Sequence, residues 1–151
     1  MQSALNASRS GTRAIYLLIA ILSVAGIVDS GIALQRHFAK SSTSFCNLGE
    51  KLNCDIVNRS EYSTIVGIPV ALIGVAGYTA LLLLSTAWRS RKETPNWLLG
   101  AAIAGLGFAL YLSYIEAYVL TTWCILCVIS LVLIFVISAL ALILRVRSAR
   151  A

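Results

Sequence analysis

Four long apolar runs dominate the pattern of hydrophobic and polar positions along the chain. They cover residues 14–35, 64–88, 97–120 and 121–144, and polar or charged residues separate most of them. The shortest has 22 residues, whereas a helix needs about 20 residues to cross the hydrocarbon core of a bilayer. The pattern therefore predicts an all-α integral membrane protein, built as a bundle of four transmembrane helices.

The segments between the runs predict how the helices connect. Residues 37–63 form a long polar loop whose apolar residues recur every three to four positions, which predicts a short helix across the end of the bundle. Loops of this length often carry function. Ser63 or Thr64 is expected to cap the second helix, with Pro69 near its first turn. Only residues 118–122 remain for the last turn, so the third and fourth helices should be antiparallel neighbours.

Charge predicts the orientation in the membrane. The net charge is +6, and eight of the twelve lysines and arginines lie in residues 1–13, 89–92 and 145–151. If the helices alternate, these residues share one side, which the positive-inside bias assigns to the cytoplasm. We therefore expect two cytoplasmic tails (1–13 and 145–151) around a membrane domain (14–144) in the inner or plasma membrane.

This orientation places the loop of residues 37–63 in the periplasm or outside the cell. The first apolar run is too long for the core of a cleavable signal peptide, so we expect it to be retained. Because the basic residues follow the topology, nucleic acid is not an expected partner.

Four cysteines offer the clearest chemistry. Cys46 and Cys54 lie in the loop, while Cys124 and Cys127 form a Cys-x-x-Cys motif at the start of the fourth helix. The topology brings both pairs to the same face. The i, i+3 spacing allows a disulfide between Cys124 and Cys127, and the helix N-terminus favours a Cys124 thiolate. The arrangement predicts a redox relay, with a mobile, water-facing loop pair, Cys124 as the junction and the deeper Cys127 facing a lipid-soluble quinone.

Two other interpretations of the cysteines stay open. Structural disulfides in a non-catalytic membrane scaffold would explain the even number of cysteines. However, a Cys-x-x-Cys disulfide closes a very small loop and constrains the unfolded chain little. A zinc site fits less well, because two of the cysteines lie at lipid level and the other two are eight residues apart.

Polar and aromatic residues near the level of Cys127 are candidate quinone contacts. The aromatic ones could equally form an interfacial belt, and Ser130 could bond to its own helix backbone. Two acidic residues, Asp29 and Glu116, lie within apolar runs, where a charge costs at least about 2.5–3.5 kcal/mol. Either could supply a proton or pair with a polar group, although Glu116 is near enough to the turn to reach the interface. The candidate contacts are Tyr62, Ser63, Tyr114, Tyr118, Trp123 and Ser130.

The order of the two cysteine pairs, together with the segment CDIVNRSEYS leading into GIPVA, resembles the bacterial vitamin K epoxide reductase homologues. The resemblance extends over about residues 14–144 and implies a quinone-dependent thiol oxidoreductase. It implies that a thioredoxin-fold, DsbA-like partner gives electrons to the Cys46–Cys54 pair. Cys54 then forms a mixed disulfide with Cys124, and Cys127 donates to menaquinone or ubiquinone without a metal.

The resemblance also bears on the partner and the quinone. Some relatives carry a fused thioredoxin-like domain, whereas this chain ends at Ala151 without one, so a separate partner is expected. Animal relatives have asparagine at the position of Ser63, four residues before the glycine equivalent to Gly67, and tyrosine at the position of Leu131. Ser63 and Gly67 are therefore implied quinone contacts, and a respiratory quinone is favoured over vitamin K epoxide.

Overall fold

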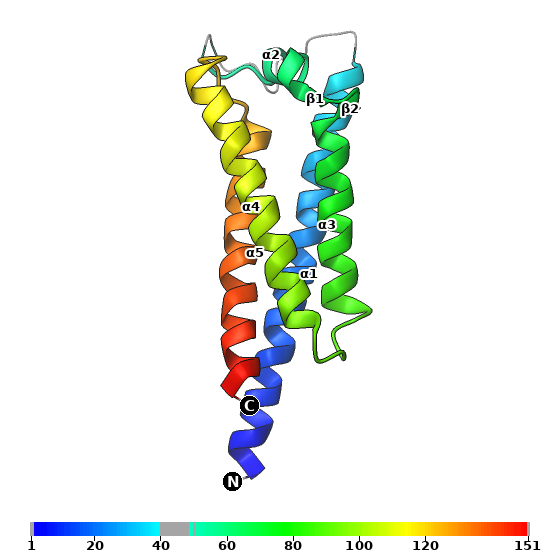
Figure 1. Ribbon diagram of the computed structural model, residues 1–151, viewed down its shortest axis with the longest axis vertical. Helices are drawn as coiled ribbons and strands as arrows, with labels where there is room; N and C mark the ends of the chain where they lie inside the picture. Colours follow the sequence, from blue (N-terminus) through cyan, green and yellow to red (C-terminus); the bar gives the residue numbers. More distant parts are fainter. Residues whose placement is uncertain (1, 40–48, 50, 151) are drawn as a thin grey trace.

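Four long helices form a bundle in the computed structural model, which describes residues 2–39, 49 and 51–150 (Figure 1). A short helix lies across one end, which we call the capped end (Figure 1). Both termini and the α3–α4 turn lie at the opposite end, the terminal end (Figure 1). The helices are α1 (Gln2–Phe38), α2 (Cys54–Asn58), α3 (Val70–Thr86), α4 (Thr94–Tyr118) and α5 (Ile125–Arg150).

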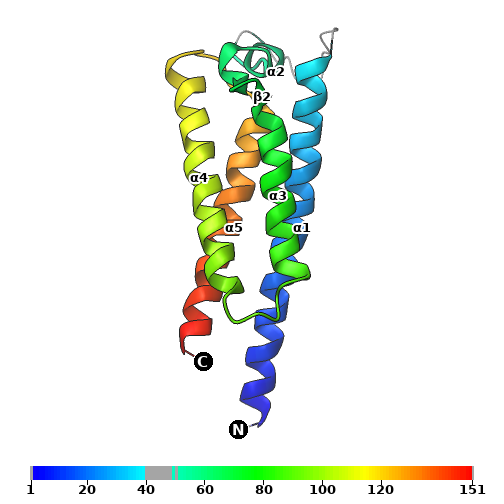
Figure 2. The same cartoon turned by 45° about the vertical axis from the view of Figure 1, so that its right-hand side comes forward.

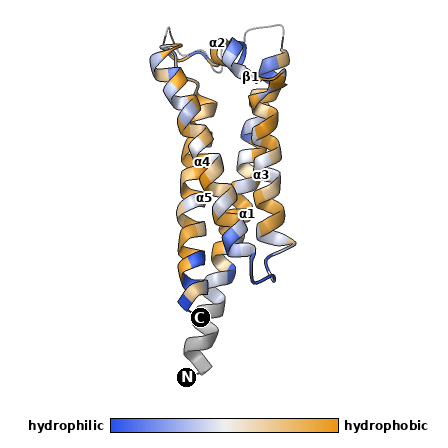
Figure 3. Cartoon of the chain, viewed as in Figure 1, coloured by the Kyte–Doolittle hydropathy of each residue, from blue (hydrophilic) through white to orange (hydrophobic). Residues whose placement is uncertain are grey.

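Length and composition make this an all-α membrane protein, as predicted. The helices α1, α4 and α5 are long and apolar enough to cross a membrane. Figure 3 shows hydrophobic residues along the long helices and hydrophilic residues at the α3–α4 turn and near the C-terminus. The apolar helix α3 has 17 residues. It is therefore about 26 Å long, at about 1.5 Å per residue, against a hydrocarbon core of about 30 Å. A fourth crossing by α3 stays a prediction.

The predicted start of the second helix was wrong. Residues 61–69 form a 3-10 turn (Glu61–Ser63) and a small hairpin of β1 (Thr64–Ile65) and β2 (Ile68–Pro69), and α3 begins only at Val70. The two turn residues, Val66 and Gly67, have positive φ values of 53° and 82°, as a two-residue hairpin turn of type I′ requires. Neither Ser63 nor Thr64 therefore caps α3.

The first helix is longer than its apolar run, since α1 begins at Gln2. Residues expected to be a tail are thus helical, which agrees with the alanine and arginine content of that segment and its lack of proline. At the other end of the fold, the predicted helix across the bundle exists as α2, but it has only five residues. The apolar residues at positions 45 and 48, which belong to the loop pattern that predicted this helix, lie outside the described residues.

The long helices pack against one another in three main pairs. The helix α1 packs against α3 and α5, and α4 packs chiefly against α5 (Figures 1 and 2). The approach of α1 to α3 is close at Gly26, where an added Cβ would lie 2.4 Å from the Tyr78 ring. The main apolar core includes the fully buried Ile19, Leu98 and Ile137. A second, smaller cluster lies at the capped end around the cysteines.

Candidate active site

Side-chain hydrogen bonds hold α2 over the capped end. Asn53 is the N-cap of α2, and its Oδ1 accepts the backbone N–H groups of Asp55 and Ile56, both at 3.1 Å. At the other end of α2, His37 Nδ1 lies 2.6 Å from the Asn58 carbonyl oxygen, and the Arg59 side chain donates to the Ala39 carbonyl. Helix α2 is therefore fixed to the end of α1.

A short backbone pairing joins the loop to the segment before α5. The Trp123 N–H donates to the Lys51 carbonyl at 2.9 Å, and the Asn53 N–H donates to the Trp123 carbonyl at 3.1 Å. Leu52 and Trp123 thus form an isolated parallel β-bridge. Cys54 follows Asn53, and Cys124 follows Trp123. Because Asn53 and Trp123 are hydrogen-bonded, this pairing sets the two cysteines beside each other.

The three described cysteines meet beneath α2. Cys54 and Cys124 are both fully buried and belong to one apolar cluster with Val57 and Leu126. Cys54 is in a disulfide, whereas Cys124 and Cys127 are free thiols. Cys46 lies outside the described residues. Cys54 is thus not the water-facing residue that we expected, because its side chain is buried in the cluster at the capped end.

Asn58 connects the two buried cysteines. Its Nδ2 donates to the Cys54 carbonyl at 2.9 Å and to Cys124 Sγ at 3.7 Å. Cys124 lies just before the first residue of α5, and a hydrogen bond with the Cys127 side chain lowers the pKa of its thiol. A thiol with such donors is suited to nucleophilic exchange. The sequence analysis missed Asn58, although its position one turn after Cys54 places both residues on one face of α2.

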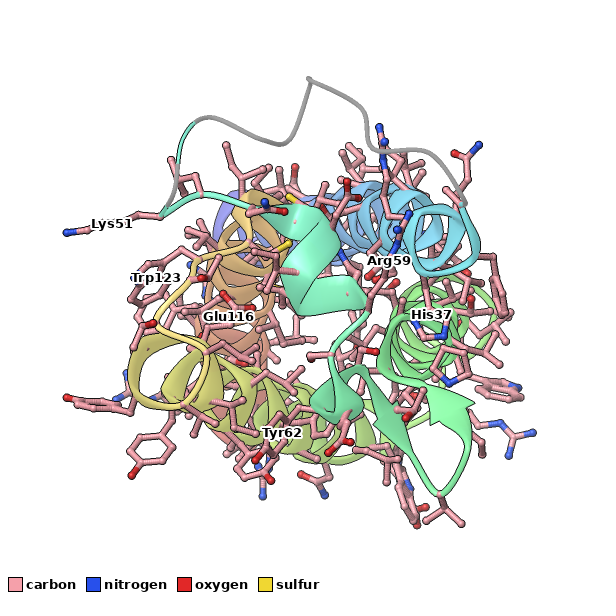
Figure 4. All side chains as sticks on the ribbon, turned by 90° about the horizontal axis from the view of Figure 1, so that it is seen from above. His37, Lys51, Arg59, Tyr62, Glu116 and Trp123 are labelled. Atoms are coloured by element: carbon pink, nitrogen blue, oxygen red, sulfur yellow. The ribbon has the colours of Figure 1, made fainter. Side chains whose placement is uncertain are left out.

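Glu116 is buried next to the Cys-x-x-Cys motif. It is 2% exposed, and its Oε2 accepts the Cys124 N–H at 3.0 Å. Its carboxylate also interacts with the Cys127 side chain. Figure 4 shows Glu116 on the inner side of the ring of helices, whereas Trp123 points outward. Glu116 is therefore part of the site around the thiols.

A cavity of about 400 Å³ opens inside the capped half of the bundle. Its walls are mostly apolar, and Cys127 lines it whereas Cys54 and Cys124 do not. Deeper along α5, Tyr78 Oη donates to the Ser130 carbonyl at 2.9 Å and lies 2.9 Å from Ser130 Oγ. Asp29 of α1 is buried nearby in the same wall and interacts electrostatically with Tyr78. The cavity thus has one thiol and a few polar groups in an apolar surrounding.

The sequence model of the vitamin K epoxide reductase family matches residues 17–142, which is most of the chain. This chain belongs to the vitamin K epoxide reductase family. The resemblance inferred from the order of the cysteine pairs is confirmed. Membership makes the protein a membrane oxidoreductase of thiols, within a family whose members are linked to quinones and typically work with thioredoxin-like partners.

The candidate quinone contacts and acidic residues of the sequence analysis fall into two groups, inside and outside the cavity. Tyr62, Ser63, Ser130, Asp29 and Glu116 line the cavity, and so do His37 and Tyr78, which the sequence analysis did not select. The others lie outside it, on the exposed hairpin turn or on the outer surface. These are Gly67, Tyr114, Tyr118 and Trp123, the three aromatic residues being 59%, 74% and 40% exposed.

Among the described residues, no group of three or more His, Cys, Asp or Glu side chains is close enough to hold a metal ion. The two thiols at the start of α5 lie between two different surroundings. The disulfide-bonded Cys54 packs next to Cys124, and the apolar cavity lies next to Cys127. This geometry suits a pair of thiols that exchanges electrons in both directions.

Proposed function

We propose that the protein oxidises a separate thioredoxin-fold partner and passes the electrons to a membrane quinone. The electrons enter at Cys46 and Cys54, move to Cys124 and Cys127, and leave to menaquinone or ubiquinone, so that exported proteins gain disulfides. One observation carries the proposal: Cys124 packs against Cys54 outside the cavity, whereas Cys127 lines the cavity.

The first step is thiol–disulfide exchange between the two pairs. A Cys54 thiolate attacks Cys124 Sγ, the Cys124–Cys127 bond breaks, and Cys127 leaves as the thiolate. A Cys46 thiolate then attacks Cys54 and releases Cys124, so two electrons have moved from the loop pair to the Cys-x-x-Cys pair. The structure, with Cys54 in a disulfide and two free thiols at α5, supports this product state.

The buried position of Cys54 assigns the outer exchange to Cys46. Cys54 begins α2 and its side chain is fully buried, so a partner's thiol cannot reach it without moving α2. Electrons from the partner therefore enter through Cys46. The capped end faces the periplasm or exterior, and the basic residues at the terminal end, which include Arg89 and Arg145, support that orientation.

The residues of the cavity fit a quinone head group. Small-molecule sites are usually apolar clefts of about 300–1,000 Å³ with a few placed polar groups, and this cavity holds about 400 Å³. A bound quinone would supply the acceptor for two electrons and two protons. Cys127 would face it as the donor thiol, and Tyr78 and Ser130 would offer hydrogen bonds from the deeper wall.

The test is quinone reduction by the purified protein in lipid nanodiscs, with a reduced DsbA-like protein as donor. Ubiquinone-1 and menadione serve as the two acceptors, and loss of quinone absorbance gives the rate. We expect turnover with the wild type and none with Cys124→Ala or Cys127→Ala, while both variants still insert and fold. Equal turnover by the wild type and the two variants, or none by any, would overturn the proposal.

A further inference from the structure

We propose that Glu116 is a catalytic residue that takes the proton of the Cys127 thiol and delivers it to the quinone in the cavity. This role rests on the proposed function and adds a proton path to its electron path. It follows from three observations on the described residues: the burial of Glu116, its hydrogen bond to the Cys124 N–H, and its place beside Cys127 in the cavity wall.

The burial of Glu116 calls for an explanation. A carboxylate within a membrane helix is costly, and such residues usually have a partner and a function. Glu116 is 2% exposed and has no cationic partner within hydrogen-bond distance among the described residues, its one geometrically formed hydrogen bond being to the Cys124 N–H. Glu116 is therefore an acid at a position where burying a neutral side chain would cost less free energy.

Anchoring the Cys124 backbone does not by itself require an acid. Oε2 accepts that N–H at 3.0 Å, but a glutamine oxygen could accept it equally well. The second oxygen, Oε1, is buried and has no hydrogen-bond partner in the described part of the chain. The carboxylate nevertheless interacts with the Cys127 side chain. One acceptor position is thus open on a carboxylate that lies beside the donor thiol.

The position of Glu116 links the thiol to the cavity. Glu116 and Cys127 line the same cavity, Glu116 from α4 and Cys127 from α5. A general base must reach the proton that it takes, and the acid must reach the atom that it protonates. Glu116 binds the backbone of Cys124, three residues before Cys127, interacts electrostatically with the Cys127 thiol and lines the cavity beside it. A small side-chain movement would therefore bring it within reach of the Cys127 proton, and the shared cavity brings it within reach of the quinone. Asp29 lines the same cavity but has no contact with Cys127 among the interactions of the described residues.

The step balances in atoms and electrons. The Cys124 and Cys127 thiols lose two electrons and two protons and form one disulfide, while the quinone gains both and becomes the hydroquinone. The Cys127 S–H bond breaks and its proton moves to the Glu116 carboxylate. Glu116 then transfers that proton to one quinone oxygen and returns to its starting form. The proton of the Cys124 thiol leaves to water at the capped end, and the second quinone oxygen takes its proton from water.

The experiment separates the quinone step from the thiol exchange. The reduced wild type, Glu116→Gln, Glu116→Asp and the exposed control Glu61→Gln are each mixed with ubiquinone-1, and a single turnover is followed by stopped-flow absorbance. The Cys54–Cys124 bridge is measured for each in a Cys127→Ser background. We expect Glu116→Gln to slow quinone reduction about 100-fold, within the range of general acid–base catalysis, with bridge formation and quinone affinity unchanged. Glu116→Asp should recover part of the rate, and Glu61→Gln all of it.

A second readout requires no quinone. Infrared difference spectra between the dithiol form and the form oxidised with diamide should contain a band of the Glu116 carboxyl group. The band arises because Glu116 loses its interaction with the Cys127 S–H when that thiol is oxidised. That band should be absent in Glu116→Gln. A solvent deuterium effect on quinone reduction by the wild type should also be lost in this variant.

The outcomes distinguish the two proposals. If the wild type reduces quinone and Glu116→Gln does so at the same rate, Glu116 is not the proton carrier, although the proposed function stands. If Glu116→Gln slows bridge formation as much as quinone reduction, Glu116 only positions Cys124, and the proton role is again overturned. If the wild type reduces neither ubiquinone-1 nor menadione, the proposed function itself fails. Should Glu116→Gln not fold, Glu116→Asp and the deuterium effect on the wild type decide.

Discussion

Replacing Asn58 with alanine should shift the pH dependence of exchange between the two cysteine pairs. Asn58 is buried, and its Nδ2 is 3.7 Å from Cys124 Sγ and 2.9 Å from the Cys54 carbonyl oxygen. A hydrogen bond to a charged group contributes about 1.5–3 kcal/mol, and about 1.4 kcal/mol corresponds to one pKa unit. At the lower end of that range, loss of this donor should destabilise the Cys124 thiolate by about 1.5 kcal/mol and raise the pKa of Cys124.

The effect on rate follows from that shift. Well below the pKa, the thiolate fraction falls about tenfold, while each thiolate becomes about threefold more nucleophilic, for a Brønsted coefficient of about 0.4–0.5. Exchange at low pH should thus slow about threefold, and the midpoint of the pH–rate profile should move upward. At low pH the variant is slower than the wild type, because less of its Cys124 is thiolate. At high pH Cys124 is a thiolate in both proteins, and the variant is faster because its thiolate is more nucleophilic.

The assay is a pH jump in the Cys127→Ser background. Protein with the loop disulfide is held at acidic pH, moved to each test pH, quenched with acid, and analysed for the Cys54–Cys124 bridge by mass spectrometry. The matched control is Asn53→Ala, which removes the α2 cap, worth about 0.5–2 kcal/mol, through the hydrogen bonds that its side chain accepts from Asp55 and Ile56. An unchanged midpoint in Asn58→Ala, or an equal shift in Asn53→Ala, would refute the reasoning.

Three further predictions concern packing, quinone binding and the hairpin. Gly26→Ala should lower the stability by about 1–3 kcal/mol through overpacking, because its Cβ would meet Tyr78 at 2.4 Å. At the control position, Gly31→Ala, the added Cβ has open space. Equal melting temperatures of the two variants would contradict the overpacking at Gly26. Tyr78→Phe should raise KM for ubiquinone-1 about 2–10-fold through the lost hydrogen bonds, whereas the exposed Tyr114→Phe should not; a similar change in both would remove Tyr78 from the site. Val66→Gly should raise the melting temperature, since Val66 has a φ of 53° and such strain costs about 1–3 kcal/mol; a lower melting temperature would count against strain.

Hydropathy and topology predicted the long helices and the meeting of the cysteines, because both depend on features that persist over many residues. The start of α3 could not be predicted in this way. Thr64 and Ile65 continue the apolar run but pair as a strand with Ile68 and Pro69. Hydropathy alone cannot separate a short strand from the first turn of a helix.

The contacts around the thiols were harder to predict for a different reason. The hydrogen bonds of Asn58 and Glu116 join residues 66 and 8 positions apart, across different elements. Only the path of the folded chain decides which polar side chain reaches Cys124. Glu116 was a candidate because of its position in an apolar run, whereas Asn58 lies in a polar loop where asparagine is ordinary.

The central claim is that electrons pass between the two cysteine pairs through Cys54 and Cys124. Mapping the disulfides of Cys127→Ser by mass spectrometry, in membranes quenched with acid, tests it most directly, with Cys124→Ser as the control. The relay predicts a Cys54–Cys124 bridge in Cys127→Ser and none in Cys124→Ser. Pairing of Cys46 with Cys54 alone in Cys127→Ser, with no bridge between the pairs, would contradict the account.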